Sequence, residues 1–152
     1  MSKQDGYVPL WKVTLFFLLS AGLYIFPWYY KTRNYLMEQR GTPKNSFIST
    51  IFLAFPIVNM VFLYDQQDLI NEFLENKKKS VELRPPVVVG LILMIGFLTA
   101  LVPYLFFMAF IIPFVMQREL NKGTAKKEYW PITIGEVIAL FLGILVWIAI
   151  LT

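Results

Sequence analysis

The sequence predicts an all-α polytopic transmembrane helix bundle, and three observations carry that prediction. Hydrophobic residues make up 57% of the 152-residue chain. Charged residues make up 16% of it, against about 25% in an average soluble domain. The apolar residues fall in long blocks rather than in amphipathic stripes, which is typical of membrane spans. We therefore expect a single membrane domain over residues 1–152.

The first apolar block predicts a membrane segment at about 10–30. Its position behind Lys3 and Lys12 is also typical of a signal peptide, but the block is long for an h-region and no A-x-A cleavage site follows. We therefore expect a retained span.

The end of this block, "IFPWYYKTRN" at 25–34, runs from proline through aromatic residues to basic ones. Tyr and Trp favour the headgroup layer, while Lys and Arg favour the water and phosphates beyond it. We expect Trp28, Tyr29 and Tyr30 to form an aromatic belt at the membrane exit, with Pro27 bending the helix just before it.

The second segment is expected at about 47–64, with Pro56 inside it. It continues as an amphipathic helix over about 62–76, because apolar and acidic residues take opposite faces there. This extension either lies at the membrane interface or forms a solvated stalk packed on a loop.

The stretch from 87 to 116 is apolar except for Thr99. At about 1.5 Å per residue it is too long for one span of a ~30 Å core. Since Pro103 interrupts it, we expect two segments, about 86–101 and 103–119. One tilted and kinked helix, giving four spans in all, is the alternative. The last segment is expected at about 131–151, starting at Pro131.

Two stretches of the chain echo each other. "IIPFVMQRELN" at 111–121 again places a proline before a polar helix end, and "GTPK" and "GTAK" follow the two stretches in turn. The pair indicates a degenerate hairpin repeat, which a five-segment chain would hold in opposite orientations, as in some transporters.

These motifs resemble those of a family of small bacterial polytopic membrane proteins, mostly without an assigned activity. In that family a first span ends in a Tyr-Trp-Phe-Tyr-Lys-type motif, a later one ends in a Pro-x-Gln-x-x-Ile-Asn-type motif, and a glycine-containing span closes the chain. Here the counterparts are "PWYYKTRNYL", "PFVMQRELNK" and "ITIGEVIALFLGILVW". Glu136 stands where the family pattern suggests a neutral polar residue. The resemblance implies architecture, and it supports two separate helices across 86–119.

Composition narrows the function classes. The chain has no Cys and no His, so thiolate chemistry and the commonest general base and transition-metal ligand are absent. No nucleophile–base pair, Walker loop or dinucleotide fingerprint is present. We expect no enzyme, cofactor or metal site. The net charge of +4 is interpreted as membrane orientation rather than nucleic-acid binding.

Three polar residues inside the apolar segments are candidate functional residues: Glu136, Asn59 and Gln117. Intramembrane carboxylates are rare and mark functional sites by default. Glu136 also has a structural interpretation, in which it lies at the headgroup level within reach of its own helix N-terminus or of Lys126 and Lys127. On that interpretation Glu136→Gln should cost about 0.3–1 kcal/mol.

Further candidates concern lipid contact and helix packing. Lys31, Arg33 and Arg118 lie at expected helix ends, where basic side chains contact lipid headgroups. Small residues at spacings of four allow close helix contact; they form two ladders, Gly135, Ala139 and Gly143, and Ser46, Thr50 and Ala54. Either ladder serves packing within one chain or between chains.

The leading functional hypothesis is a small integral protein of the bacterial inner membrane that acts by association, as a scaffold, accessory subunit or membrane-organising protein. The alternative is a channel or carrier for an ion or small solute. Expected partners are membrane lipids and a homo-oligomer or larger membrane complex. With five spans, the loop at 31–44 lies opposite the more basic loops, which predicts the N-terminus inside and the C-terminus outside.

Overall fold

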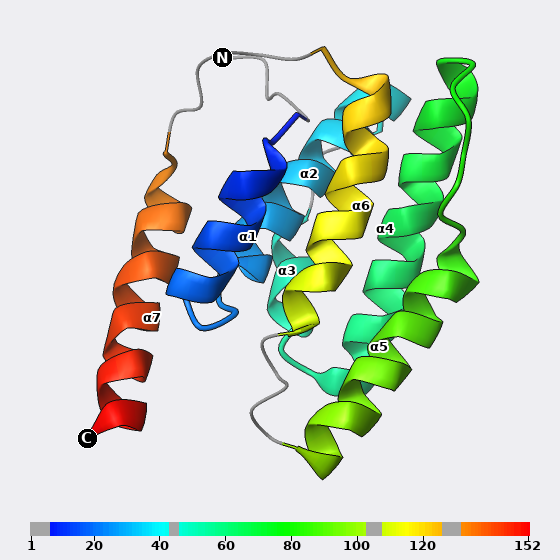
Figure 1. The fold of residues 1–152 in the computed structure, drawn as a ribbon. Coiled ribbons are helices and arrows are strands. Elements are labelled where there is room, and N and C mark those ends of the chain that lie inside the picture. Colours follow the sequence, from blue (N-terminus) through cyan, green and yellow to red (C-terminus); the bar gives the residue numbers. More distant parts are fainter. Residues whose placement is uncertain (1–6, 43–45, 103–107, 126–131) are drawn as a thin grey trace.

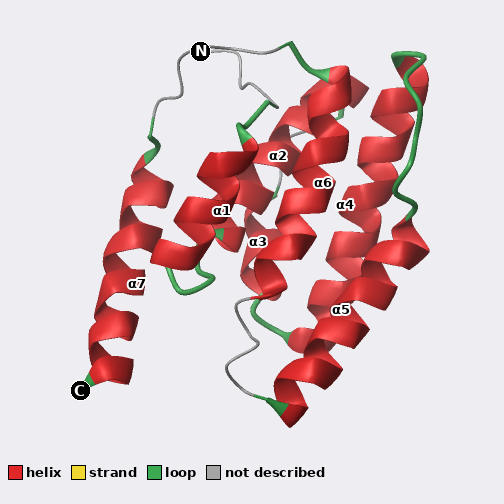
Figure 2. Ribbon diagram, viewed as in Figure 1, coloured by secondary structure: helices red, strands yellow, loops and turns green. Residues whose placement is uncertain are grey.

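The computed structural model describes residues 7–42, 46–102, 108–125 and 132–152. Within these residues the chain is all-helical, as predicted, with seven α-helices and no strand (Figure 1, Figure 2). The helices are α1 (Leu10–Leu19), α2 (Ile25–Arg40), α3 (Phe47–Phe52), α4 (Pro56–Asn76), α5 (Pro85–Leu101), α6 (Ile111–Gly123) and α7 (Ile134–Leu151).

Successive helices run in alternating directions (Figure 1). Side-chain contacts fix the register. The ion pairs Arg33–Asp65 and Arg40–Glu72 show that α2 and α4 are parallel, because the residue numbers rise together along both helices. α1 is antiparallel to α6, since Val8 meets Asn121. The C-terminal ends of α2, α4 and α6 therefore meet the N-terminal ends of α1 and α7 at one end of the bundle.

The expected segment at 10–30 is two helices rather than one. α1 stops after ten residues, and the chain reverses at Ala21 and Gly22, whose φ angles are 49° and 88°. Glycine adopts this left-handed conformation without strain. The Ser20 hydroxyl accepts from the Tyr24 N–H at 2.8 Å and so supports the start of α2. The segment is a tight helical hairpin with its turn at 20–24.

The segment at 47–64 is divided as well. α3 ends at Phe52, Phe55 is extended, and α4 begins at Pro56 and continues unbroken to Asn76. Proline disfavours helical geometry in the residue before it and fits the first helical position. Pro27 and Pro113 are each the third residue of their helix, α2 and α6. All three prolines lie in the first turn of a helix, so Pro27 does not bend a continuous helix as expected.

The remaining segments correspond to α5, α6 and α7. α6 begins at Ile111, and residues 103–107 and Pro131 lie outside the described residues. Among the described residues, α7 is the one helix long and apolar enough to cross a membrane, while α1 and α5 are shorter apolar helices. Within the described residues, the five uninterrupted spanning helices are therefore not formed, since the first two expected segments are each divided.

Charge is segregated along the bundle. The runs 13–30, 45–64, 85–117 and 137–152 contain no charged residue. The structure gathers the described residues of these runs at one end, where the α1–α2 and α3–α4 turns and the C-terminus of α7 lie (Figure 1). We call this the charge-free end and the opposite one the polar end. Arg33 and Arg40 lie at the polar end with Glu72 and Lys77, so the expected placement of 31–44 on the opposite side from Lys77 is wrong.

The two echoing stretches lie in α2 and α6, and these helices run in the same direction. Trp28 of α2 meets Gln117 of α6, and both helices rise from the charge-free end to the polar end (Figure 1). The opposite orientation expected of an inverted repeat is therefore wrong.

Candidate functional site

A buried ion pair joins α1 to α7. The Lys12 ammonium lies 3.0 Å from Glu136 Oε1 and donates to Oε2 at 3.1 Å. Each side chain is only 2% exposed. The ammonium also lies 5.1 Å from the centre of the Phe16 ring, at a distance where a cation–π attraction operates. The pair is thus removed from water and shielded by apolar and aromatic groups.

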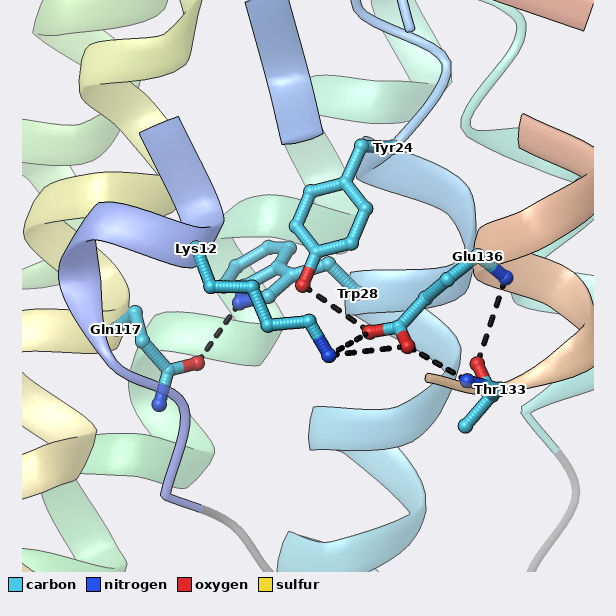
Figure 3. A network of polar contacts seen from close by, with 6 residues as sticks. All are labelled: Lys12, Tyr24, Trp28, Gln117, Thr133 and Glu136. Atoms are coloured by element: carbon cyan, nitrogen blue, oxygen red, sulfur yellow. Dashed lines mark hydrogen bonds and ion pairs between the residues drawn. The ribbon is translucent and has the colours of Figure 1, made fainter. Parts of the chain in front are cut away.

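Glu136 has further partners at the start of its own helix (Figure 3). Thr133 is the N-cap of α7: its backbone N–H donates to Glu136 Oε2 at 2.8 Å, and its hydroxyl accepts from the Glu136 N–H at 3.4 Å. This capping box satisfies two N–H groups that a helix start leaves free. The Tyr24 hydroxyl donates to Oε1 at 3.3 Å. Both carboxylate oxygens therefore have partners.

A second chain of hydrogen bonds ties α2, α6 and the N-terminal segment together. Trp28 Nε1 donates to Gln117 Oε1 at 2.8 Å, and Gln117 Nε2 donates to Asn121 Oδ1 at 2.7 Å. Asn121 then exchanges two hydrogen bonds with the backbone of Val8. Trp28 and Gln117 are fully buried, so this chain fixes how α6 sits against α2.

A third polar set lies between α2 and α4. Arg33 pairs with Asp65 at 2.6 Å, and Gln66 donates to the Thr32 hydroxyl at 2.9 Å. The buried side-chain oxygens Gln66 Oε1 and Gln67 Oε1 have no hydrogen-bond partner among the described residues. Polar groups in this position are usually satisfied by ordered water.

The three candidate intramembrane polar residues do not form one site. Gln117 is hydrogen-bonded to Trp28 (Figure 3). Asn59 lies in the first turn of α4, toward the charge-free end. It is half-buried, and its Oδ1 has no hydrogen-bond partner within the described part of the chain. A shared path lined by Glu136, Asn59 and Gln117 is not assembled.

Among the candidate headgroup contacts and the residues of the expected aromatic belt, some are exposed and others are buried or paired inside the bundle. Arg118 is exposed, Lys31 is half-buried, and Arg33 is engaged with Asp65 and with the Tyr29 ring. Trp28 and Tyr29 are buried in the core, whereas Tyr30 is exposed. The expected belt is wrong for the two buried aromatic residues, because they lie on the inner face of α2, where Trp28 contacts Gln117 of α6.

One small-residue ladder packs within the chain. Ala139 and Gly143 are buried on α7, and a Cβ at Gly143 would lie 2.6 Å from the Ser20 carbonyl oxygen. Gly135 is exposed at the edge of this face, with a Cβ there 3.4 Å from Pro27.

The other ladder is broken. Ser46 is buried and donates to Asn34, Thr50 bonds back to Ser46, and Ala54 lies exposed in the turn after α3. The end of α3 at Phe52 takes Ala54 out of helical register with the other two.

At the polar end, the linker after α4 is attached to α6. Lys122 lies 2.8 Å from both Glu82 and Glu119, and the Glu82 N–H donates to Glu119 at 3.3 Å. The hydrogen bond and the charge of Lys122 lower the pKa of Glu82. Desolvation lowers the pKa of Lys122, but its two carboxylate partners outweigh that effect and raise it.

Lys12, Tyr24, Trp28 and Thr133 are functional-site residues that the sequence interpretation missed. Lys12 carried a usable signal, because it is the one charged residue between Asp5 and Lys31. An opposite charge in another apolar segment, Glu136, is its natural partner. Thr133 and Glu136 also match the spacing of a capping box.

The Lys12–Glu136 pair and its neighbours are arranged to hold helices together, and the carboxylate is not positioned to react with a substrate. Glu136 is saturated by Lys12, Tyr24 and Thr133, so no lone pair is presented to a substrate. Among the described residues there is no group of three or more acidic residues that could hold a metal ion. The pair and the Trp28–Gln117 chain together hold α1, α2, α6 and α7 in one register.

Comparison with known proteins gives no relative. No family model, no curated protein and no solved structure matches the chain.

Proposed function

We propose that this protein is a small integral membrane protein that acts by association, as a scaffold, accessory subunit or membrane-organising protein of the bacterial cytoplasmic membrane. One observation carries the proposal: the charge-free end exposes large apolar side chains over several helices. Examples are Phe55 at 55%, Phe97 at 66% and Phe141 at 62% exposed. Water would penalise such a surface, while lipid or an apolar protein face would cover it.

The internal polar groups support association over transport. Lys12 and Glu136 satisfy each other, and Gln117 satisfies Trp28. Residues used in this way define the shape of the bundle and leave its outer surface as the part available for interaction. Since Lys and Arg favour the cytoplasmic side, the polar end is assigned to the cytoplasm.

The test begins with membrane residence. Alkaline carbonate extraction of membranes from cells that express the full chain should leave the protein in the pellet. A photoreactive side chain at Leu145, which is 48% exposed on α7, should then crosslink to lipid or protein within the membrane. The matched position Gln39, exposed at the polar end, should give neither product. Recovery of the chain in the carbonate supernatant would refute the proposal.

A channel or carrier is the second candidate. The fully buried Gln66 and Gln67 each keep a side-chain oxygen without a partner among the described residues, and water or a polar solute would satisfy these oxygens. Proteoliposomes containing the full chain should then conduct an ion or solute, and Gln66→Leu should abolish that flux while Lys79→Gln leaves it intact. Absence of flux for a panel of common ions and small solutes rejects this candidate.

A further inference from the structure

The charge-free end is uneven in depth. From the last charged residue on each helix, α1 and α6 extend about seven more residues, which is about 10 Å, and α4 extends about nine, which is about 14 Å. α7 extends about fifteen residues beyond Glu136, and α5 about seventeen beyond Arg84, which is about 22–26 Å. Figure 1 shows α5 and α7 reaching past the α1–α2 turn and the start of α6.

These depths differ by about one leaflet of a bilayer. The hydrocarbon core is about 30 Å thick, so each leaflet contributes about 15 Å. The hairpin tips at 20–24 and 53–55 would stop near the midplane, while α5 and α7 enter the far leaflet. Within the part of the chain that the structure describes, the centre of the bundle then occupies the near leaflet only, and something apolar must cover the tips.

Resting on the proposed membrane location, we propose that the acyl chains of the far leaflet rise to cover the hairpin tips, so that the protein locally thins its bilayer. The partner is a lipid surface whose chains are short enough to close under the centre. A protein organised in this way would favour thin membrane regions.

Lipid is the occupant that the exposure pattern fits. Beyond Gly143, α7 exposes Ile144, Leu145, Val146 and Ile148, which cover the sides of the helix other than the one that Trp147 turns to α1. A second copy or a partner helix would cover one of these sides, whereas acyl chains cover all of them. Beyond Glu136, α7 carries no charged residue, and neither do the tips at 20–24 and 53–55, so no charge is available there to orient a protein partner.

The experiment uses the absence of cysteine in the chain. Phe55→Cys at the α3–α4 tip, Leu145→Cys on α7 and Gln39→Cys at the polar end are each labelled with a bimane and reconstituted as the full chain. The vesicles contain phosphatidylcholine brominated near the ends of its acyl chains. Leu23→Cys, in the α1–α2 turn, is a second tip probe that does not depend on the Phe55 variant folding.

We expect bromine quenching at both tip probes to approach that at Leu145→Cys and to be absent at Gln39→Cys. We also expect the relative association constant for lipid to fall by about threefold or more from dimyristoleoyl to dierucoyl phosphatidylcholine. Tip probes shielded from bromine while Leu145→Cys is quenched would mean that protein covers the tips, and would overturn the inference. A flat or rising dependence on chain length would overturn thinning. Absence of quenching at Leu145→Cys would instead defeat the membrane location itself.

Discussion

Replacing Lys12 with methionine should destabilise the fold strongly, because it leaves the Glu136 carboxylate buried without its counter-ion. Both side chains are 2% exposed, so water cannot replace the lost partner. Removing one member of a buried pair costs about 3–5 kcal/mol, against about 0–1 kcal/mol for an exposed pair. The Tyr24 hydroxyl and the Thr133 N–H still donate to the carboxylate, so we expect a loss near the lower limit, about 3 kcal/mol.

Glu136→Gln probes the same pair from the other side. The glutamine keeps the shape and an acceptor for the Thr133 N–H but strands the Lys12 ammonium, so we again expect a loss of about 3 kcal/mol. The smaller loss of about 0.3–1 kcal/mol expected from the sequence applies to an exposed charge at a helix start. Because the Lys12–Glu136 pair is buried, the expected loss of stability is larger.

The assay is thermal unfolding of the full chain in one detergent, with the single and double variants of Lys12 and Glu136. About 3 kcal/mol corresponds to a fall in Tm of about 6–12 °C for a domain of this size. In the double variant Lys12→Met with Glu136→Gln, the losses should not add, because one interaction is removed twice. Arg40→Met is the matched control, since its pair with Glu72 is 53% and 44% exposed. A Lys12→Met shift no larger than the control, or additive losses, would refute the buried pair.

Three further predictions concern packing, hydrogen bonding and pH. Gly143→Ala should lower stability by about 1–3 kcal/mol through overlap with the α1–α2 turn, whereas Gly96→Ala, with open space at its Cβ, should not lower the Tm; equal effects would contradict this packing. Trp28→Phe should cost about 1–3 kcal/mol, because a buried amide oxygen loses its donor, and an unchanged Tm would show that this bond is dispensable. Because the pKa of Glu82 is lowered, its pair contributes stability above the ordinary value of 4.5 and loses it as pH falls through the folded pKa. The raised pKa of Lys122 keeps its charge, and the pair, intact up to and beyond its ordinary value of 10.5. Hydrogen exchange at the Glu82 amide, corrected for intrinsic rate, should therefore accelerate in acid and stay slow at neutral pH; protection that persists in acid would contradict the attachment.

The all-helical class of the fold was predictable from the sequence, because the apolar residues fall in long blocks rather than in the short alternating runs of strands. The helix breaks were less so. "SAGLY" at 20–24 contains the signals of a turn, serine and glycine, but the apolar residues around it have the length of a span. The helix break at 20–24 depends on the left-handed conformation of Gly22 and on the Ser20 hydroxyl that caps α2. A hydropathy pattern detects neither feature.

Prolines were the second source of error. Pro27 was expected to bend its helix, and Pro56 and Pro113 lie inside segments that were predicted as continuous helices. Each instead stands in a first helical turn, where the missing N–H costs no hydrogen bond. A proline that begins a helix implies a break before it, and that break changes the direction of the chain and the side on which the following loop lies.

The ion pair was half predictable. Glu136 stood out as a carboxylate in an apolar segment, and its position near a helix start was expected. Its partner was sought in the adjacent loop, at Lys126 and Lys127, which lie outside the described residues. The actual partner, Lys12, is 124 residues away. Such a pairing depends on α1 and α7 lying parallel, which no local pattern encodes.

The central claim is that the chain enters the membrane by its charge-free end, with every charged segment left on one side. Single cysteines at Gln39, Lys79 and Ala125, all exposed positions, can be tested in sealed vesicles of known orientation with a maleimide that does not cross membranes. The structure predicts that all three react from the same side. Labelling of Gln39→Cys from the side opposite to Lys79→Cys, as five full spans would require, would contradict it.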